Sequence, residues 1–506
     1  MSQTRSKYSL LNAVTAMAMT LVNGLMGIVV TKMVIEAFGS DFNGLNATAN
    51  QIVNVLLILE GGFTLASNVA LFTPLTRADY AAVNGILAAT RSKFRRIGLL
   101  FLGAGVLVAA GYALAANSAL PRGFIATVIM MTVIPGAFNL FYATTYRVLL
   151  QTQQREFVIN LISIATLGLG HTVNIVMIRL GGPMWAVRFI TMTFALINSL
   201  LIAGFVKKRT PYLDCRQAPT PEKIKGTNDV MIQKITGVIY NSAPIVFLSV
   251  SPSGGTVLAS VYAVYNNIFL MLKSLLHSVI DAPRLSFGQL MTEKEKKDIW
   301  PTFAQYEYAA FLAIFVLLTT CSVLILPFIG LYTNGITDAN YYDGRIALLM
   351  TAIAALELLH IPSGHIINMA GEFKISRNIQ VIACITLVAG LAVGGSIWGV
   401  YGMLVSVLTV AALLCVLEMG YIHTRFFGRK LGQLARLLIP LTAAGVGVSF
   451  LEMQLPLELT GYLKFGVWGV LLVLVNAAAA LAVSAVFNRQ QIRGLIRKLR
   501  HLLRKS

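Results

Sequence analysis

Charged side chains are scarce in this sequence of 506 residues. Asp, Glu, Lys and Arg together make up 12% of it, about half the share found in soluble domains. Only 20 residues are acidic, against 40 that are basic, so the net charge is +20. This composition excludes an ordinary soluble globular protein.

Cysteines and nucleotide-binding motifs are also lacking. Three of the four cysteines lie in apolar stretches and the fourth, Cys215, lies in a polar one, so neither a disulfide framework nor a metal site is indicated. No stretch matches the phosphate-binding loop of an ATPase, and the polar segments are too short to contain an ATPase domain. We therefore expect no cofactor. Energy would come from a proton or Na⁺ gradient, from the membrane potential, or from consumption of the product outside.

Apolar residues are abundant. They make up 57% of the chain, and the mean hydropathy is +0.75. No cleavable signal peptide precedes a soluble region. We predict an all-α polytopic membrane protein with about fourteen transmembrane helices, each long enough to cross about 30 Å of hydrocarbon. The predicted spans are Leu10–Val34, Gly44–Leu71, Arg96–Ala116, Phe124–Leu150, Phe157–Ile178, Trp185–Val206, Val230–Val250, Val257–Val279, Tyr308–Ile329, Ile346–Met369, Ile379–Ile397, Tyr401–Thr424, Leu437–Leu451 and Tyr462–Phe487.

Basic residues cluster in alternate loops between these spans. The clusters are Arg91, Lys93, Arg95 and Arg96; Lys207, Lys208, Arg209, Arg216, Lys223 and Lys225; Lys294, Lys296 and Lys297; and Arg425, Arg429 and Lys430. The positive-inside rule then places both termini in the cytoplasm. The tail 488–506 mixes cations with apolar residues and predicts an interfacial helix on anionic lipid. Because membrane lipids account for these cations, nucleic acid is not an expected partner.

Several landmarks recur about 216 residues later in the chain, as in transporters built from internal repeats. The matched pairs are Asn50 and Asn266, Glu156-Phe157 and Glu372-Phe373, and the amphipathic loops 77–95 and 293–304. We predict two pseudo-symmetric six-helix lobes followed by two C-terminal helices. The expected parts are an N-terminal lobe 1–206, a cytoplasmic linker 207–229, a C-terminal lobe 230–424, two extra helices within 425–487, and the basic tail 488–506.

Two stripes of polar residues interrupt apolar helices. The first comprises Asn46, Asn50, Asn54, Glu60, Thr64 and Asn68, and the second comprises Tyr262, Asn266, Lys273, His277, Asp281 and Arg284. At about 100° per residue, each set stays on one side of a helix. Ionisable groups are costly at bilayer depth, so such stripes face a bundle interior or a wet cavity. The sequence therefore predicts movement of a polar substrate through a membrane.

Short motifs spread over nearly the whole chain point to one family. They are Leu59-Glu60-Gly61-Gly62, Phe72-Thr73-Pro74-Leu75, Tyr240-Asn241-Ser242, Tyr265-Asn266-Asn267, Ala370-Gly371-Glu372-Phe373-Lys374 and Trp398-Gly399-Val400-Tyr401-Gly402-Met403. Together they resemble polysaccharide flippases of the multidrug/oligosaccharidyl-lipid/polysaccharide exporter superfamily. Ala243-Pro244 stands where members often carry an acid, and the apolar run 385–393 replaces a polar pair. Substrate contacts on those two helices are therefore not carried over.

The resemblance implies two lobes around a central cavity, without enzymatic activity. It implies that an undecaprenyl-diphosphate-linked oligosaccharide is moved from the cytoplasmic to the outer leaflet by alternating access. The protein would serve surface polysaccharide assembly in a bacterial inner membrane. Other assembly proteins are expected partners, and we expect a monomer.

The expected substrate contacts follow from the chemistry of such a lipid. They are Asn46, Asn50, Asn54, Tyr262, Asn266, Lys273, Arg284, Arg147 and Arg188. Lys273 and Arg284 suit the diphosphate, the amides suit sugar hydroxyls and the tyrosine suits a pyranose face. Arg147 and Arg188 either snorkel to headgroups or turn inward and widen a cationic cavity. In the alternative interpretation, Lys273 pairs with Asp281 and the amides hold helices together.

Four residues are candidates for coupling to H⁺ or Na⁺: Glu60, His277, Asp281 and Glu357. A carboxylate in the middle of a span is either paired or protonated, and a histidine can relay protons. Glu60 either binds the coupling ion or neutralises Lys273 or Arg147.

Two other functions stay open. A cation-coupled multidrug exporter of the same superfamily would have a more acidic and aromatic cavity. A membrane glycan polymerase or ligase would need a sizeable outer loop, and the longest one expected here, Leu331–Gly344, is short.

Overall fold

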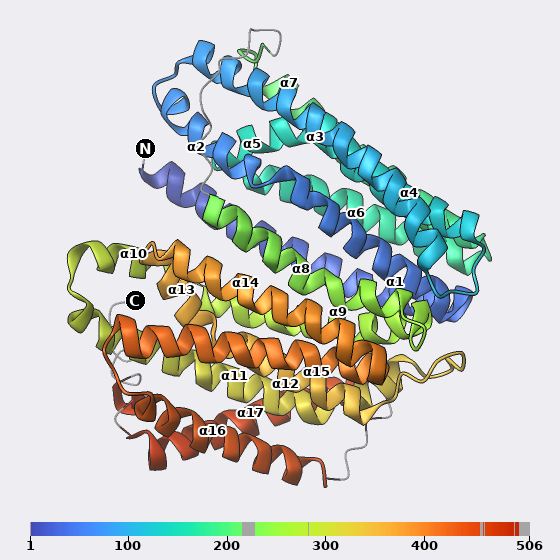
Figure 1. The fold of residues 1–506 in the computed structure, drawn as a ribbon. Coiled ribbons are helices and arrows are strands. Elements are labelled where there is room, and N and C mark those ends of the chain that lie inside the picture. The colour runs from blue at the N-terminus through green and yellow to red at the C-terminus, as the bar shows by residue number, and fades with distance from the viewer. Residues whose placement is uncertain are drawn as a thin grey trace. The chain divides into compact units, whose positions relative to one another are not determined.

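The computed structural model describes residues 2–214, 228–281, 283–455, 459, 461–489 and 491–494. These residues form helices and no strands (Figure 1). Most of the expected linker and most of the basic tail lie outside the described residues. The elements are α1 Ser2–Leu56, η1 Leu57–Glu60, α2 Phe63–Thr76, α3 Tyr80–Ala115, α4 Arg122–Phe138, η2 Asn139–Ala143, α5 Thr144–Thr152, α6 Glu156–Arg179, α7 Met184–Arg209, α8 Asn228–Val250, α9 Gly255–Ile280, α10 Arg284–Glu293, α11 Lys296–Tyr332, α12 Gly344–Leu359, α13 Ile361–Met369, α14 Phe373–Gly390, η3 Leu391–Gly395, α15 Ser396–Leu414, η4 Cys415–Met419, η5 Tyr421–Phe426, α16 Leu431–Glu452 and α17 Tyr462–Phe487.

Eleven helical segments of the described chain are long and apolar enough to cross a membrane. The predicted spans lie mainly in helical structure, but Gly61-Gly62 interrupts the span Gly44–Leu71 and His360 interrupts the span Ile346–Met369. The segment Phe373–Phe426 contains two predicted spans, and the segment Leu11–Glu60 contains most of the first span and part of the second. One segment breaks at Gly39 (φ 85°) and the other at Gly399 (φ 57°), where glycine adopts a conformation that side chains oppose. The protein is therefore a multi-pass, all-helical membrane protein. The number of crossings and the side of each terminus stay predictions.

The repeat is visible in where helices begin. α3 begins at Tyr80 and α11 at Lys296, about 216 residues apart. The same offset separates Gly39 from Gly255, and both have a positive φ. Glu156 begins α6, and Glu372 is the N-cap of α14. Equivalent helices therefore start at equivalent positions in the two copies of the repeat.

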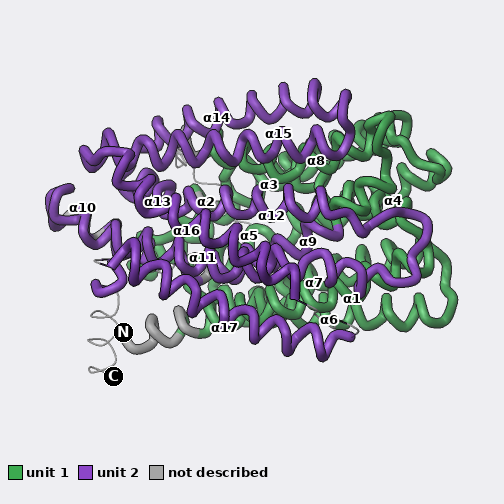
Figure 2. The backbone as a smooth tube through the Cα atoms, turned by 90° about the horizontal axis from the view of Figure 1, so that it is seen from below, with its two compact units in different colours: residues 1–263 green, residues 264–506 purple. Residues whose placement is uncertain are grey.

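The chain forms two compact units, residues 1–263 and 264–506, with the boundary inside α9 (Figure 2). In unit 1, α6 packs between α1 and α7, and α8 packs on α1. In unit 2, α11 packs against α12, α16 and α17, and α14 packs against α15. Because α8 packs on α1, it belongs to unit 1. The boundary between the two units therefore falls later in the chain than the expected boundary between the lobes. The lobe, linker and tail boundaries expected from the sequence stay predictions.

A carboxylate caps α12 in unit 2. Asp343 Oδ1 accepts hydrogen bonds from the backbone N–H of Arg345 (2.8 Å) and Ile346 (3.2 Å), and Oδ2 accepts one from the Tyr401 hydroxyl (2.6 Å). Burial alone would raise the pKa of Asp343, but these hydrogen bonds outweigh burial and hold the pKa below its ordinary value of 3.8. The cap therefore fixes the start of α12 to α15.

Candidate functional site

Arg188 is a buried cation that lies beside the first polar stripe. It lies one turn into α7, and only 7% of its surface is exposed. Its Nε donates to Asn46 Oδ1, and its Nη2 donates to the Asn46 backbone oxygen. Its Nη1 donates to Asn50 Oδ1 at 3.1 Å. Of the two sequence-based alternatives, the structure thus has Arg188 turned into unit 1 and bound to two stripe amides.

The partners of Arg188 are all neutral. No carboxylate among the described residues lies within ion-pair distance of its guanidinium. A buried charge without a counter-ion is costly, and neutral amide oxygens offset only part of that cost. The site is therefore electropositive and suited to an anion, whose oxygens match the planar fork of arginine.

Arg147 repeats this arrangement on another helix of unit 1. It lies on α5, and its Nη2 donates to Asn198 Oδ1 at 2.7 Å. The Asn198 amide in turn donates to Ser163 Oγ (3.1 Å) and Thr166 Oγ1 (2.8 Å). Arg147 Nε is buried without a partner among the described residues. A second cation of unit 1 is thus held by neutral oxygen alone.

The rest of the first stripe is polar but modestly engaged. Asn54 donates to Gln51 Oε1 at 3.0 Å, and both Asn50 and Asn54 are exposed. Glu60 accepts a hydrogen bond from Thr64 and lies 3.9 Å from Lys234 Nζ on α8. Sequence reasoning had named Lys273 or Arg147 as the cation that neutralises Glu60. The cation beside it is Lys234, which was missed because it lies outside both stripes.

In the second stripe, Lys273 is paired. Its Nζ lies 2.7 Å from Glu357 Oε2 on α12, and both side chains are largely buried. The expected partner, Asp281, was wrong. Tyr262 is buried in unit 1, whereas Asn266, in unit 2, is partly buried. Lys273 and Glu357, one expected at the substrate and one at a coupling ion, therefore form one ion pair in this structure.

The second stripe ends earlier than the pattern predicted. α9 stops at Ile280, because Pro283 cannot continue the helix, and the exposed Arg284 begins α10 instead. Asp281 lies beyond α9, with Oδ1 3.1 Å from His365 Nε2 and 3.7 Å from His277 Nδ1. Asp281 and Arg284 are therefore not part of the α9 stripe.

Two further acid–histidine pairs in unit 2 were not recognised from the sequence. Glu418 Oε2 lies 2.9 Å from His360 Nδ1, and Glu307 lies 3.1 Å from His423 Nε2. Glu307 stands directly before a long apolar run, and that placement was the only signal for it. No spacing along the chain links Glu307 to His423, which is 116 residues away.

The arrangement of helices is that of transporters of the MOP superfamily. The structure of a multidrug resistance MATE family transporter of this superfamily, in an inward-facing conformation, matches with a TM-score of 0.65 at 12% identity, over 81% of this chain and 97% of that chain. The lipid II flippase MurJ, in an inward closed conformation, matches with a TM-score of 0.64 at 12% identity, over 96% of this chain and all of that chain (100%). A MOP superfamily transporter from Pyrococcus furiosus matches with a TM-score of 0.52 at 12% identity, over 83% and 94%.

No protein-family model and no curated protein sequence matches this chain. At 12% identity the solved structures establish the fold. The superfamily that the sequence motifs resemble is represented among the structural neighbours, and at this identity the likeness concerns the fold. These neighbours are transporters and flippases rather than enzymes, in line with the expectation from the sequence.

Proposed function

We propose that this protein is a flippase that translocates an undecaprenyl-diphosphate-linked oligosaccharide from the cytoplasmic to the outer leaflet of a bacterial inner membrane. The observation that carries the proposal is the buried guanidinium of Arg188, whose partners among the described residues include two amide side chains and no carboxylate. In an exporter of cations, an uncompensated positive charge in the interior would repel the substrate. A diphosphate supplies the missing negative charge.

The chemistry of Arg188 supports exchange of partners during transport. The hydrogen bonds from the guanidinium to the amides have a charged donor only, whereas a phosphate oxygen also carries a negative charge and adds Coulomb attraction. A phosphate oxygen would therefore displace the Asn46 or Asn50 amide from the guanidinium. The released amides, each with a donor and an acceptor, are then free for the sugar hydroxyls.

The proposal changes the expected role of Lys273. Its ammonium already has a carboxylate partner, Glu357, at 2.7 Å. Binding a phosphate there would require that ion pair to open, whereas Arg188 has no carboxylate to leave. We therefore assign the diphosphate to Arg188 and Arg147 first, and keep Lys273 as a secondary contact. Alternating access, a monomeric state and contact with other assembly proteins belong to the same proposal.

The test is translocation of a fluorescent undecaprenyl-diphosphate oligosaccharide in proteoliposomes. We compare the wild type with Arg188→Gln, Arg188→Lys and the control Arg179→Gln, which removes an exposed arginine at the end of α6. We expect Arg188→Gln to translocate about 10- to 100-fold more slowly, the loss of one or two charge-assisted hydrogen bonds. Arg188→Lys should be intermediate, and Arg179→Gln should match the wild type.

Equal rates in wild type and Arg188→Gln would remove the anion site from the proposal. The structural likeness to a multidrug resistance transporter supplies the second candidate, a cation-coupled exporter of drugs. Efflux of cationic dyes by the wild type, without lipid translocation and unchanged in Arg188→Gln, would favour that candidate. A polymerase or ligase has no support from the transporter fold.

A further inference from the structure

All four described histidines of unit 2 have carboxylate partners. The pairs are His277 and His365 with Asp281, His360 with Glu418, and His423 with Glu307. In unit 1, by contrast, His171 lies 3.4 Å from the Asn23 amide oxygen. A histidine can exchange a proton near neutral pH, and a neighbouring carboxylate offsets the charge that the imidazole gains. Among the described residues, such pairs lie in unit 2.

The pair formed by Glu307 and His423 is the most enclosed of these. Glu307 lies on α11 and His423 on η5, and each is 1% exposed. His423 Nε2 is 3.1 Å from both carboxylate oxygens, so Nε2 carries the hydrogen that Glu307 accepts. The other ring nitrogen, Nδ1, is buried and has no hydrogen-bond partner among the described residues. No other group of the described residues therefore binds the imidazole at Nδ1.

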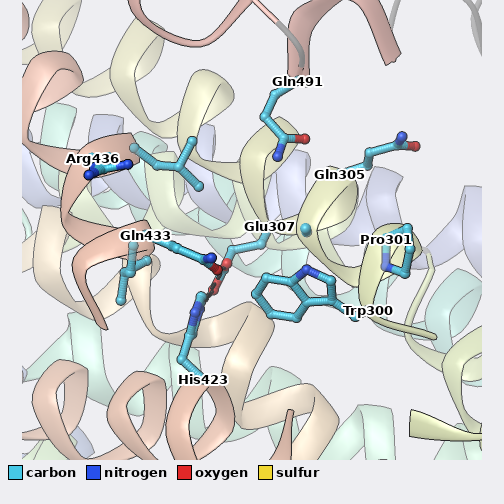
Figure 3. A pocket seen from close by; sticks show the side chains of 11 residues that line it. Trp300, Pro301, Gln305, Glu307, His423, Gln433, Arg436 and Gln491 are labelled. Carbon is cyan, nitrogen blue, oxygen red and sulfur yellow. Dashed lines mark hydrogen bonds and ion pairs between the residues drawn. The ribbon is translucent and has the colours of Figure 1, made fainter. Parts of the chain in front are cut away.

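A pocket of about 430 Å³ reaches this pair, with room for several water molecules. It is lined by Trp300, Gln305, Glu307, His423, Gln433 and Arg436, among others. Figure 3 shows Glu307 and His423 pointing toward one another, with Gln433 beside them and Trp300 alongside. The Trp300 ring packs edge-on against the imidazole, 5.3 Å between centroids. Polar side chains of the pocket thus lie next to an acid–base pair that is otherwise buried.

The charged neighbours favour a proton over a metal ion or other cation as the occupant. Arg436 of α16 lines the pocket, and Arg429 lies over the Trp300 ring at 5.1 Å. Their positive charges oppose a further cation, and a metal ion would need more ligands than this single carboxylate and imidazole, whereas a proton needs only one acceptor. On α11, the neighbouring Tyr306 donates or accepts through its hydroxyl at His365 Nδ1 (3.0 Å), so it faces the Asp281 pair.

We propose that Glu307 and His423 form a proton-binding site that exchanges protons with water in this pocket. With His423 neutral, the pair has a net charge of −1. A hydronium ion in the pocket gives its proton to the pair and leaves water, and the protonated pair carries no net charge. Release of the proton to water reverses the step. The proposal concerns protons rather than the glycan, so it goes beyond the proposed function and is independent of the substrate.

The test is proton uptake by the purified full-length protein in detergent, measured with an indicator dye as the pH is stepped from 8 to 5, the range in which histidines titrate. The variants are Glu307→Gln, His423→Gln and Glu307→Asp. The control is Glu295→Gln, which removes an exposed carboxylate outside this pocket. We expect Glu307→Gln and His423→Gln each to take up about one proton fewer than the wild type. Glu307→Asp and Glu295→Gln should retain the wild-type uptake.

Equal uptake in all variants would overturn the proposal. Loss of uptake in Glu307→Asp as well would also overturn it, because it would trace the effect to disturbed packing rather than to the acid. Thermal unfolding of each variant checks that the fold is kept. The lipid translocation assay separates this proposal from the proposed function, since a wild type that binds the proton but moves no lipid would contradict only the latter.

Discussion

Unit 1 and unit 2 handle buried positive charge in opposite ways. In unit 1, Arg188 and Arg147 are held by amide and backbone oxygens. In unit 2, the ammonium of Lys273 is paired with a carboxylate, and each described histidine lies beside a carboxylate that would receive its positive charge on protonation. The charge of a cation with neutral partners stays available to an anionic ligand. A carboxylate partner, by contrast, already neutralises the charge of its cation.

The comparison teaches that similar spacing of helices along the chain does not bring similar electrostatics. Helices such as α3 and α11 start about 216 residues apart, yet charges are placed differently in the two units. We propose that unit 1 attracts an anion and that unit 2 exchanges protons. The predictions below add a carboxylate to the Arg188 site of unit 1, remove a carboxylate from unit 2, or remove a single weaker contact.

Placing a carboxylate beside Arg188 in unit 1 should have the largest effect on translocation. Asn46→Asp keeps the size of the side chain that binds Arg188 but adds a negative charge. We expect translocation to fall about 100-fold or more, because the acid occupies the guanidinium in place of the phosphate. The lipid translocation assay measures this, and thermal unfolding should show a protein at least as stable as the wild type. Undiminished translocation would contradict the anion site.

Removing a carboxylate from unit 2 should destabilise it. Glu357→Gln leaves the Lys273 ammonium without its partner, and breaking a buried ion pair costs about 3 kcal/mol. We expect a clear drop in the thermal unfolding temperature. The double variant Lys273→Met/Glu357→Gln should recover most of it, since no unpaired charge remains. A double variant as unstable as the single one would show that the pair has other partners that matter more.

Weakening the cap of α12 should have a smaller, pH-dependent effect. Because the pKa of Asp343 is held below 3.8, its contribution to stability is fully present above that pH and is lost as the pH falls through the lowered pKa. Tyr401→Phe removes one of the hydrogen bonds responsible and should cost about 1–2 kcal/mol at neutral pH. Denaturation at pH 7 and at pH 3 should show the difference between wild type and variant shrinking at the lower pH.

The smallest effect is expected from Asn54→Ala. This exposed amide bonds only to Gln51 among the described contacts, so stability should change by less than about 0.5 kcal/mol. If the amide contacts sugar hydroxyls, translocation should fall several-fold while the unfolding temperature stays constant. Unchanged translocation would assign Asn54 to the structure rather than to the substrate.

Much of the fold could be predicted from the sequence because apolar length alone identifies a helix in lipid. The predicted spans lie mainly in helical structure, although Gly61-Gly62 interrupts the second of them, and the breaks at Gly39 and Gly399 fall between predicted spans. The end of α9 was misjudged because a periodic pattern continues past Pro283, while the helix cannot. Local patterns therefore located the helices but overran one of their ends.

The partners of the charged residues could not be predicted in the same way. Lys273 with Glu357 and His423 with Glu307 are pairs between helices far apart in sequence, and periodicity within one helix carries no information about them. The sequence predicts that Arg188 either snorkels or turns inward, but its amide partners are defined only by packing. The stripes identified which residues are polar inside the membrane, and tertiary structure decided what each of them binds.

The placement of Arg188 also bears on how the chain is inserted during synthesis. An arginine within an apolar segment raises the cost of moving that segment from water into lipid. α1, with Asn46 and Asn50, is synthesised before α7, so the oxygens that receive the guanidinium already exist when α7 emerges. Because of the order of helices along the chain, the hydrogen-bond acceptors for Arg188 are therefore already synthesised when α7 enters the bilayer.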